Sequence, residues 1–122
     1  MQKVEYINMN AILDLDMDQM SRNAAQASRF LKTLANERRL MILCHLVEGE
    51  KSVGELERLL GMRQPALSQQ LTRLREEKLV ATRRESRTIY YRVASEEAMA
   101  LLGKLHELFC GADHGRDGTA DR

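Results

Sequence analysis

Two cysteines are the residues of this chain with the clearest capacity for covalent chemistry. Cys44 and Cys110 are far apart in the sequence, so only the fold could bring them together. A thiolate is both a nucleophile and a metal ligand. The sequence contains no CxxC motif and no close cluster of Cys and His, which argues against a zinc finger. The two thiols therefore suggest a reactive pair, and the alternative is that each is an inert core residue.

A second set of side chains has the chemistry to recognise DNA. Gln suits the edge of adenine, Arg suits guanine or a phosphate, and Ser and Thr adapt to either kind of base. These residue types occur on one face of a predicted helix that follows a tight turn, at Gln64, Ser68, Gln69, Thr72 and Arg73. They predict a recognition helix whose outward face contacts bases.

Arginines are concentrated in the segment directly after this helix, at Arg83, Arg84, Arg87 and Arg92. A basic hairpin beside a recognition helix can straddle a flanking phosphate backbone. Either feature alone is commonly a solvated surface, but their order predicts binding to double-stranded DNA. We expect contacts from the recognition helix and from Arg83, Arg84 and Arg87.

The distribution of charge supports this prediction, whereas its total does not. The formal net charge of the whole chain is only +1. Residues 63–93, however, contain eight basic and three acidic residues and so carry a net charge of +5. Positive charge concentrated in one stretch is typical of a surface that binds phosphates.

Hydrophobic periodicity predicts the elements that must position these residues. A first helix over residues 17–33 follows several Asp residues, which complement a helix dipole. A second begins after Asn36 as its N-cap, contains Cys44 and ends at Gly49. Because this second helix is apolar almost all round, we expect it to be buried at the centre of the fold.

The next two helices are marked by local signals. Ser52 and Glu55 match a capping box that starts a short third helix, and Gly61 closes it. Pro65 is tolerated in the first turn of a fourth helix. The residues that share one face of this fourth helix are Leu67, Leu71, Leu74 and Lys78.

A hairpin and a last helix complete the pattern. Residues 79–84 and 88–93 read as two short strands joined by residues 85–87, although this turn lacks Gly or Asn. Ser95 can cap a last helix that ends at Cys110 and Gly111. The apolar stripe of that helix is formed by Ala98, Leu101, Leu102, Leu105, Leu108 and Phe109.

This order of elements predicts a mainly α winged helix-turn-helix with five helices and a small β-hairpin. We expect an N-terminal arm at residues 1–16, a DNA-binding and dimerisation domain at 17–111, and a flexible tail at 112–122. Aromatic residues make up only 4% of the chain, so the core is thin, and a homodimer would bury more apolar area. The sequence shows no signal-peptide or membrane-spanning pattern, which predicts a cytoplasmic protein without a membrane partner.

Several motifs resemble those of the ArsR family of winged-helix repressors. The resemblance extends from about residue 20 to residue 110, with the motifs in the family's order: residues 34–40 (LANERRL), 52–56 (SVGEL), 64–71 (QPALSQQL), 74–80 (LREEKLV), 82–84 (TRR) and 89–92 (IYYR). It implies a homodimer with the first and last helices at the interface. It also implies an inverted-repeat operator that is bound, with transcription blocked, until an inducer arrives.

Many members of that family sense metals, but their ligand patterns are not matched by this chain. One pattern needs a Cys pair in the first helix of the helix-turn-helix, where this sequence reads SVGELE at residues 52–57. The other needs spaced ligands along the last helix, where His106 and Glu107 are adjacent and so lie on different faces. We therefore expect neither a metal nor another cofactor. His45 and His114 are assigned ordinary packing or surface roles.

The cysteine positions resemble a different branch, the sulfide-responsive and biofilm-growth repressors. The matching segments are residues 42–44 (ILC) and 108–110 (LFC). The resemblance implies that Cys44 and Cys110 react with persulfides or polysulfides, become bridged by sulfur atoms and release the operator of sulfide-oxidation genes. This is consistent with thiolate chemistry, because a sulfane sulfur is a soft electrophile that one Cys attacks while the other resolves the adduct.

Three alternatives stay open at this point. The chain could be a metal- or peroxide-responsive repressor of the same fold. It could be a DNA-binding protein whose cysteines are inert. An enzyme that uses a thiol, such as a peroxidase or a sulfur transferase, is disfavoured because no acid–base partner lies near either Cys in the sequence and because the basic wing would have no role. We therefore expect a regulator and not an enzyme.

Overall fold

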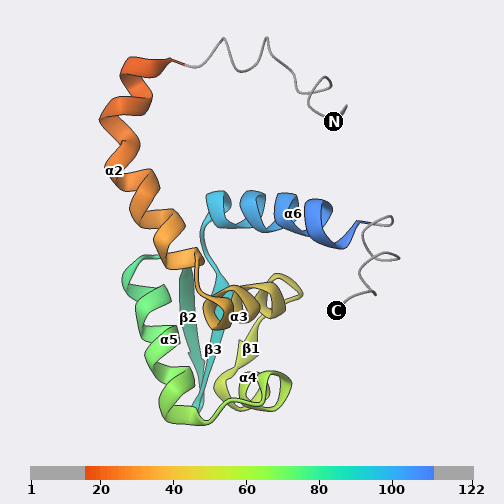
Figure 1. Ribbon diagram of the computed structural model, residues 1–122. Coiled ribbons are helices and arrows are strands. Elements are labelled where there is room, and N and C mark those ends of the chain that lie inside the picture. The colour runs from red at the N-terminus through yellow and green to blue at the C-terminus, as the bar shows by residue number, and fades with distance from the viewer. Residues whose placement is uncertain (1–15, 112–122) are drawn as a thin grey trace. The chain divides into compact units, whose positions relative to one another are not determined.

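The structure is a computed structural model that describes residues 16–111. Five helices and three strands occupy this part of the chain (Figure 1). In chain order they are α2 (Met17–Leu34), α3 (Glu37–Val47), β1 (Lys51–Ser52), α4 (Val53–Leu60), α5 (Gln64–Glu76), β2 (Val80–Glu85), β3 (Thr88–Val93) and α6 (Glu96–Cys110). The predicted tail, with His114, and the predicted arm up to residue 15 lie outside the described residues.

Helix α2 makes up nearly all of the described part of the first of two compact units, which ends at Lys32. The helix begins where the sequence predicts, because Asp16 accepts a hydrogen bond from the backbone N–H of Gln19 at 3.1 Å. Most of its side chains are exposed in the single chain, including the large apolar Met17 and Leu31.

The second unit begins at Thr33 and contains the predicted helix-turn-helix. Local signals set its helix ends. Asn36 caps α3 by accepting from the backbone N–H of Arg39, and Ser52 forms both bonds of the predicted capping box with Glu55 at the start of α4. Ser95 caps α6 by accepting from the backbone N–H of Ala98. These predicted caps are therefore confirmed.

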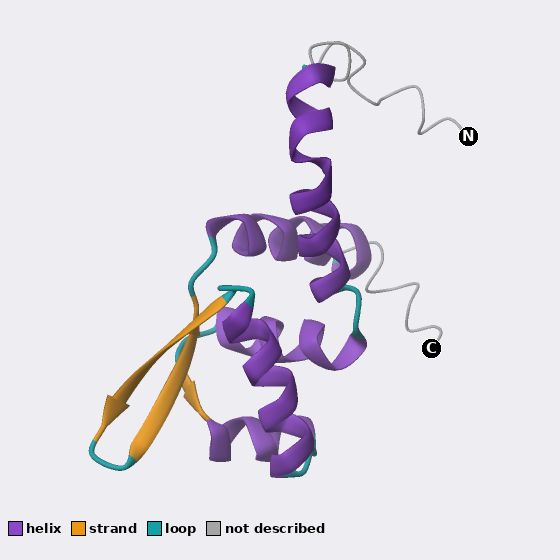
Figure 2. Cartoon of the chain, turned by 90° about the vertical axis from the view of Figure 1, so that its left-hand side faces the viewer, coloured by secondary structure: helices purple, strands orange, loops and turns teal. Residues whose placement is uncertain are grey.

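The sheet contains one strand more than the sequence predicts. Strand β3 is the centre of an antiparallel sheet with the order β1-β3-β2, which lies along one side of the helices of this unit (Figure 2). The added strand β1 has only two residues and pairs with Tyr90 and Tyr91. The hairpin turn is also tighter than expected, because Glu85 extends β2 and pairs with Thr88.

The core is built from aliphatic side chains, as the low aromatic content predicts. The large aliphatic side chains without measurable exposure come from α3, α4 and α5: Ile42, Leu43, Leu56, Leu67, Leu71 and Leu74. Within the described residues, no helix is both long enough and apolar enough to span a membrane.

Two predictions about helix faces are wrong, and the stripe of α6 is only partly buried in the single chain. Helix α3 is not buried all round, because it packs on one side only and leaves Met41, Cys44 and Val47 exposed. Lys78 does not extend the face of the fourth helix, because α5 ends at Glu76 and Lys78 adopts a positive φ of 63°. The predicted stripe of α6 is buried at Ala98 and Leu102 but exposed at its end, where Leu108 and Phe109 lie.

Candidate DNA-binding surface and thiol pair

Helices α4 and α5 form the helix-turn-helix, and Gly61 makes the tight turn between them. Gly61 adopts the left-handed conformation at φ 66°, which glycine reaches without steric cost. The buried face of α5 carries Leu67, Leu71 and Leu74. This anchoring leaves the five predicted recognition residues on the exposed surface: Gln64, Ser68, Gln69, Thr72 and Arg73.

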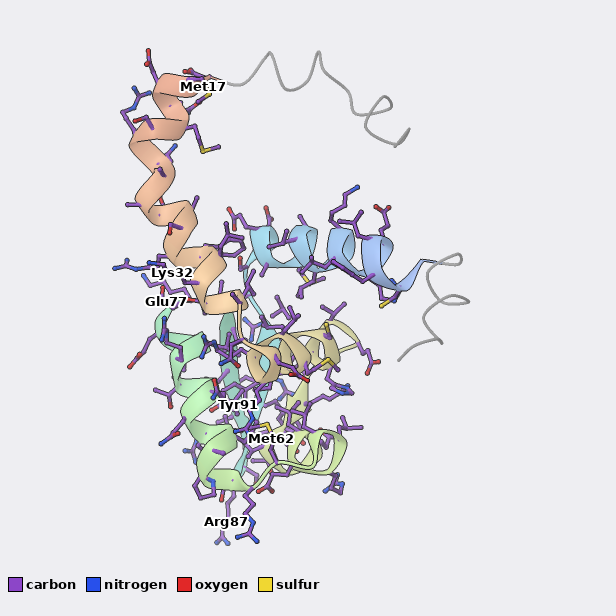
Figure 3. All side chains as sticks on the ribbon, in the orientation of Figure 1. Met17, Lys32, Met62, Glu77, Arg87 and Tyr91 are labelled. Atoms are coloured by element: carbon purple, nitrogen blue, oxygen red, sulfur yellow. The ribbon has the colours of Figure 1, made fainter. Side chains whose placement is uncertain are left out.

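The wing is the hairpin of β2 and β3. Arg84 and Arg87 are exposed on it, and Arg87 lies at its tip (Figure 3). The tip and the N-terminal end of α5 are at the same end of the unit in both ribbon views (Figures 1 and 2). The fold therefore brings the polar face of α5 and the basic tip close enough to address one DNA duplex. Their roles as DNA contacts stay predictions.

Arg83 differs from these two arginines because acidic side chains already hold it. Its Nε donates to both carboxylate oxygens of Glu50, at 2.8 and 3.0 Å, and its Nη1 donates to Glu85 at 2.9 Å. The guanidinium carbon also lies 4.7 Å from the ring centroid of Tyr90. The hydrogen bonds to Glu85 and Glu50 raise the pKa of Arg83. Sequence reasoning missed Glu50 because the two residues meet only in the folded chain.

A second arginine links the start of α3 to the recognition helix. Arg39 donates from Nε to the carbonyl oxygen of Thr33 at 2.6 Å and from Nη1 to the side-chain oxygen of Gln70 at 3.0 Å. Burial, followed by the nearby charge of Arg73, lowers the pKa of Arg39. The link was also missed, although Arg39 and Gln70 both lie within the family motifs.

The two cysteines are both exposed free thiols, and the fold brings them near each other. Cys44 lies on α3 and Cys110 is the last residue of α6, and these two helices are in contact. Partial burial raises the pKa of the Cys44 thiol, and the charge of Cys110 raises it further. The contact between α3 and α6 therefore places the two cysteines on adjoining elements of the second unit.

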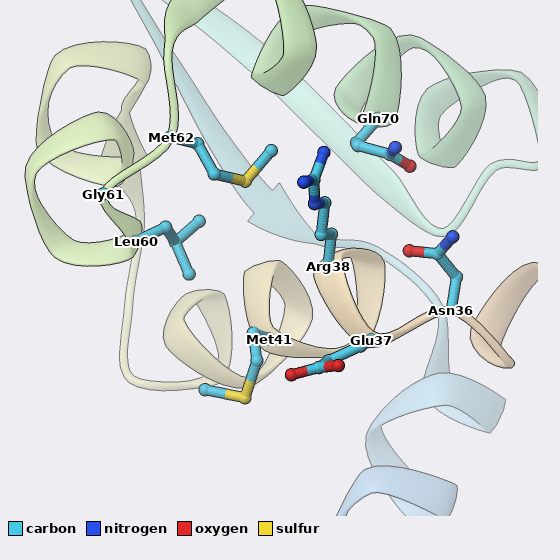
Figure 4. A pocket seen from close by; sticks show the side chains of 8 residues that line it. All are labelled: Asn36, Glu37, Arg38, Met41, Leu60, Gly61, Met62 and Gln70. Carbon is cyan, nitrogen blue, oxygen red and sulfur yellow. The ribbon is translucent and has the colours of Figure 1, made fainter.

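An open pocket of about 650 Å³ lies where α3 meets the turn before α5 (Figure 4). Arg38 extends into it between Met62 and Gln70. Its lining contains no cysteine, so the pocket and the thiol pair are separate places. Within the described residues, no group of three or more His, Cys, Asp or Glu side chains is placed to hold a metal ion.

Comparison with known proteins agrees with this geometry. Residues 36–82, which include the helix-turn-helix, match the family model described as bacterial regulatory protein, arsR family. The chain is 46% identical over 99 residues to the transcriptional activator HlyU of Vibrio cholerae, covering 81% of this chain and 92% of that protein. It is 46% identical over 100 residues to the biofilm growth-associated repressor of Agrobacterium fabrum, covering 82% and 86%.

A solved structure extends the similarity to the fold. The transcriptional repressor BigR from Xylella fastidiosa is 46% identical, with a TM-score of 0.74, over 79% of this chain and 98% of that chain. The predicted resemblance to the biofilm-growth repressors is thereby confirmed, as is the winged helix-turn-helix fold. This chain belongs to the ArsR family of bacterial regulatory proteins and is a DNA-binding transcriptional regulator, not an enzyme.

Proposed function

We propose that this regulator is a thiol-responsive repressor, which binds operator DNA as a homodimer and releases it when Cys44 and Cys110 become bridged through sulfur. The observation that carries the proposal is that two exposed free thiols lie on α3 and α6, two helices that are far apart in the sequence and in contact in the fold. Nothing in the sequence spacing requires these cysteines to lie on helices that contact each other.

An organic persulfide, RSSH, is the proposed inducer. One cysteine thiolate takes the sulfane sulfur of RSSH and releases RSH, and the resulting protein persulfide takes a second sulfur in the same way. The other cysteine then attacks the inner of the two added sulfur atoms and expels hydrogen sulfide. Two thiols and two RSSH thus give one trisulfide, two RSH and one H₂S. The two electrons lost by the thiols reduce one sulfane sulfur to sulfide.

A bridge between α3 and α6 has a route to the DNA-binding surface. Helix α3 also carries Arg39, which holds Gln70 on the recognition helix α5. A shift of α3 therefore displaces α5. Recognition helices of a dimer must match half-sites about 34–36 Å apart, so a small displacement weakens binding at both. Moving the bound-competent fraction from about 99% to about 1% requires about 5.5 kcal/mol, which a covalent bridge can supply.

The homodimer is supported by the apolar end of α6. Leu108 is 51% exposed and Phe109 is 68% exposed in the single chain. Large apolar side chains grouped in this way at the end of a helix are typical of a surface that a second copy covers. Repression, as opposed to activation, is proposed from the repressor relatives, since the HlyU relative is named an activator. A reporter gene placed behind the bound promoter decides the direction.

The test is mass spectrometry combined with DNA-binding titrations of the same reduced protein. We expect an organic persulfide to join Cys44 to Cys110 with added sulfur mass and to weaken DNA binding, and we expect Cys44→Ser and Cys110→Ser to keep their DNA affinity under the same treatment. Hydrogen peroxide and oxidised glutathione are run in parallel. A bridge formed equally well by peroxide would make the protein a general oxidant sensor, and unchanged DNA affinity after bridging would contradict the switch.

A further inference from the structure

We propose that Arg83 is a positioning residue that fixes the wing relative to the helix-turn-helix, and that Arg84 and Arg87 make the wing's phosphate contacts. We use the name Arg83 clasp for the group formed by Arg83 and its three partners, Glu50, Glu85 and Tyr90. The inference rests on the DNA binding of the family and not on the proposed thiol switch. It replaces the expectation that Arg83 itself contacts DNA.

The clasp engages two of the three nitrogens through which Arg83 could bind a phosphate, Nε and Nη1. A guanidinium binds oxyanions through its edge, with paired N–H donors. In Arg83, Nε is shared by the two oxygens of Glu50 and Nη1 is taken by Glu85. One flat face of the guanidinium is directed at the ring of Tyr90. Two carboxylates surround one cation, so the clasp carries a net negative charge that repels a phosphate.

The clasp lies where the wing meets the segment that leads into α4. Tyr90 pairs with Arg83 on β2 and with Ser52 on β1. Ser52 is in turn the N-cap of α4, the first helix of the helix-turn-helix. Because β1 has only two residues, its backbone pairing with the wing is short. The contact from Glu50, directly before β1, adds a side-chain tie between the wing and the segment that enters α4.

Arg84 and Arg87 are more available than Arg83 to contact a phosphate. Both are exposed, and within residues 16–111 neither forms an ion pair. Arg87 follows Ser86 in the two-residue turn at the tip of the hairpin. A cation at the tip of a wing is free to approach the backbone of a bound duplex.

The test is the salt dependence of DNA binding by the reduced full-length protein, with a duplex selected from a random pool by the wild type. Each phosphate contact contributes about 0.9 to the slope of log K against log salt. Because the proposed homodimer carries Arg87 twice, we expect Arg87→Gln to lower the slope by about 1.8, which is twice that amount. Arg83→Gln is expected to weaken binding by about twofold to tenfold with an unchanged slope, and Arg83→Lys is not expected to restore it, since Lys lacks the paired donors.

Glu50→Gln gives the sharper result, because the two models predict opposite signs. If Arg83 positions the wing, loosening its contact with Glu50 weakens DNA binding relative to Glu48→Gln, which removes the charge of an acid two residues earlier. If Arg83 binds phosphate, removing the competing carboxylate strengthens binding. The proposal is overturned by stronger binding of Glu50→Gln, by a lowered slope of Arg83→Gln, or by wild-type affinity in both variants. Glu50→Gln decides the matter even where Arg83→Gln does not fold.

Discussion

At the residue scale, the reactivity of the site depends on how hard it is to form the Cys44 thiolate. Burial disfavours the charged form of a thiol, and a second thiolate nearby disfavours it through like-charge repulsion. Both effects raise the pKa of Cys44, and burial is the larger. Near neutral pH, Cys44 is therefore mostly a protonated thiol, which slows its attack on any electrophile and favours a strongly electrophilic sulfur species over a weak general oxidant.

This argument predicts the pH dependence of Cys44 alkylation by iodoacetamide, followed by mass spectrometry of the Cys44 peptide. In the wild type, the rate should rise to a midpoint above about 8.5, the ordinary pKa of a Cys thiol. In Cys110→Ser the neighbouring charge is lost, so the midpoint of Cys44 should fall. It should stay above the ordinary value, because burial remains. An unchanged midpoint in Cys110→Ser would mean that the two thiols are not neighbours in solution.

At the scale of elements, local signals in the sequence were sufficient to predict most helix ends. Asn36, Ser52 and Ser95 cap helices through bonds to residues three positions ahead, so each signal lies within one short window. The sequence did not predict strand β1 or two side-chain pairs, Glu50–Arg83 and Arg39–Gln70. They join residues from separate elements, and no periodicity within one element encodes which distant side chain will be its partner.

The Arg39–Gln70 link predicts how the thiol pair communicates with α5. Arg39→Met removes the bonds to Gln70 and to the carbonyl of Thr33, and hydrogen bonds from charged groups contribute about 1.5–3 kcal/mol. We expect urea denaturation to show a loss of stability of about this size. We also expect persulfide treatment to weaken DNA binding less than in the wild type, because α3 no longer holds α5.

Arg38→Met is the matched control for that experiment. Arg38 is adjacent, exposed and directed into the open pocket, so its loss should leave both stability and the persulfide response close to wild type. If Arg39→Met kept the full persulfide response, the bridge would have to act on DNA binding through the dimer interface alone.

At the scale of the whole molecule, one chain leaves apolar surface that its own core does not cover. The buried core consists of a small set of aliphatic side chains, whereas Leu108 and Phe109 at the end of α6 remain exposed. The same end carries Cys110, so a surface proposed for dimerisation and one of the two thiols are continuous along the chain. A bridge at Cys110 can therefore act on the association of two copies as well as on α5.

Leu108→Glu tests this arrangement by placing a charge in the proposed interface. Sedimentation velocity at several concentrations should show a dimer for the wild type and a monomer for Leu108→Glu, because burial of an unpaired carboxylate is costly. Leu59→Glu is the control, since Leu59 on α4 is equally exposed at 51% and should leave the dimer intact.

The monomeric variant Leu108→Glu should keep its fold and bind a duplex with one half-site about as well as the wild type does. It should lose the added affinity for two half-sites, because that affinity requires both recognition helices to bind at once. Dimers of Leu108→Glu would place the interface elsewhere on the molecule and would separate the sensing end of α6 from assembly.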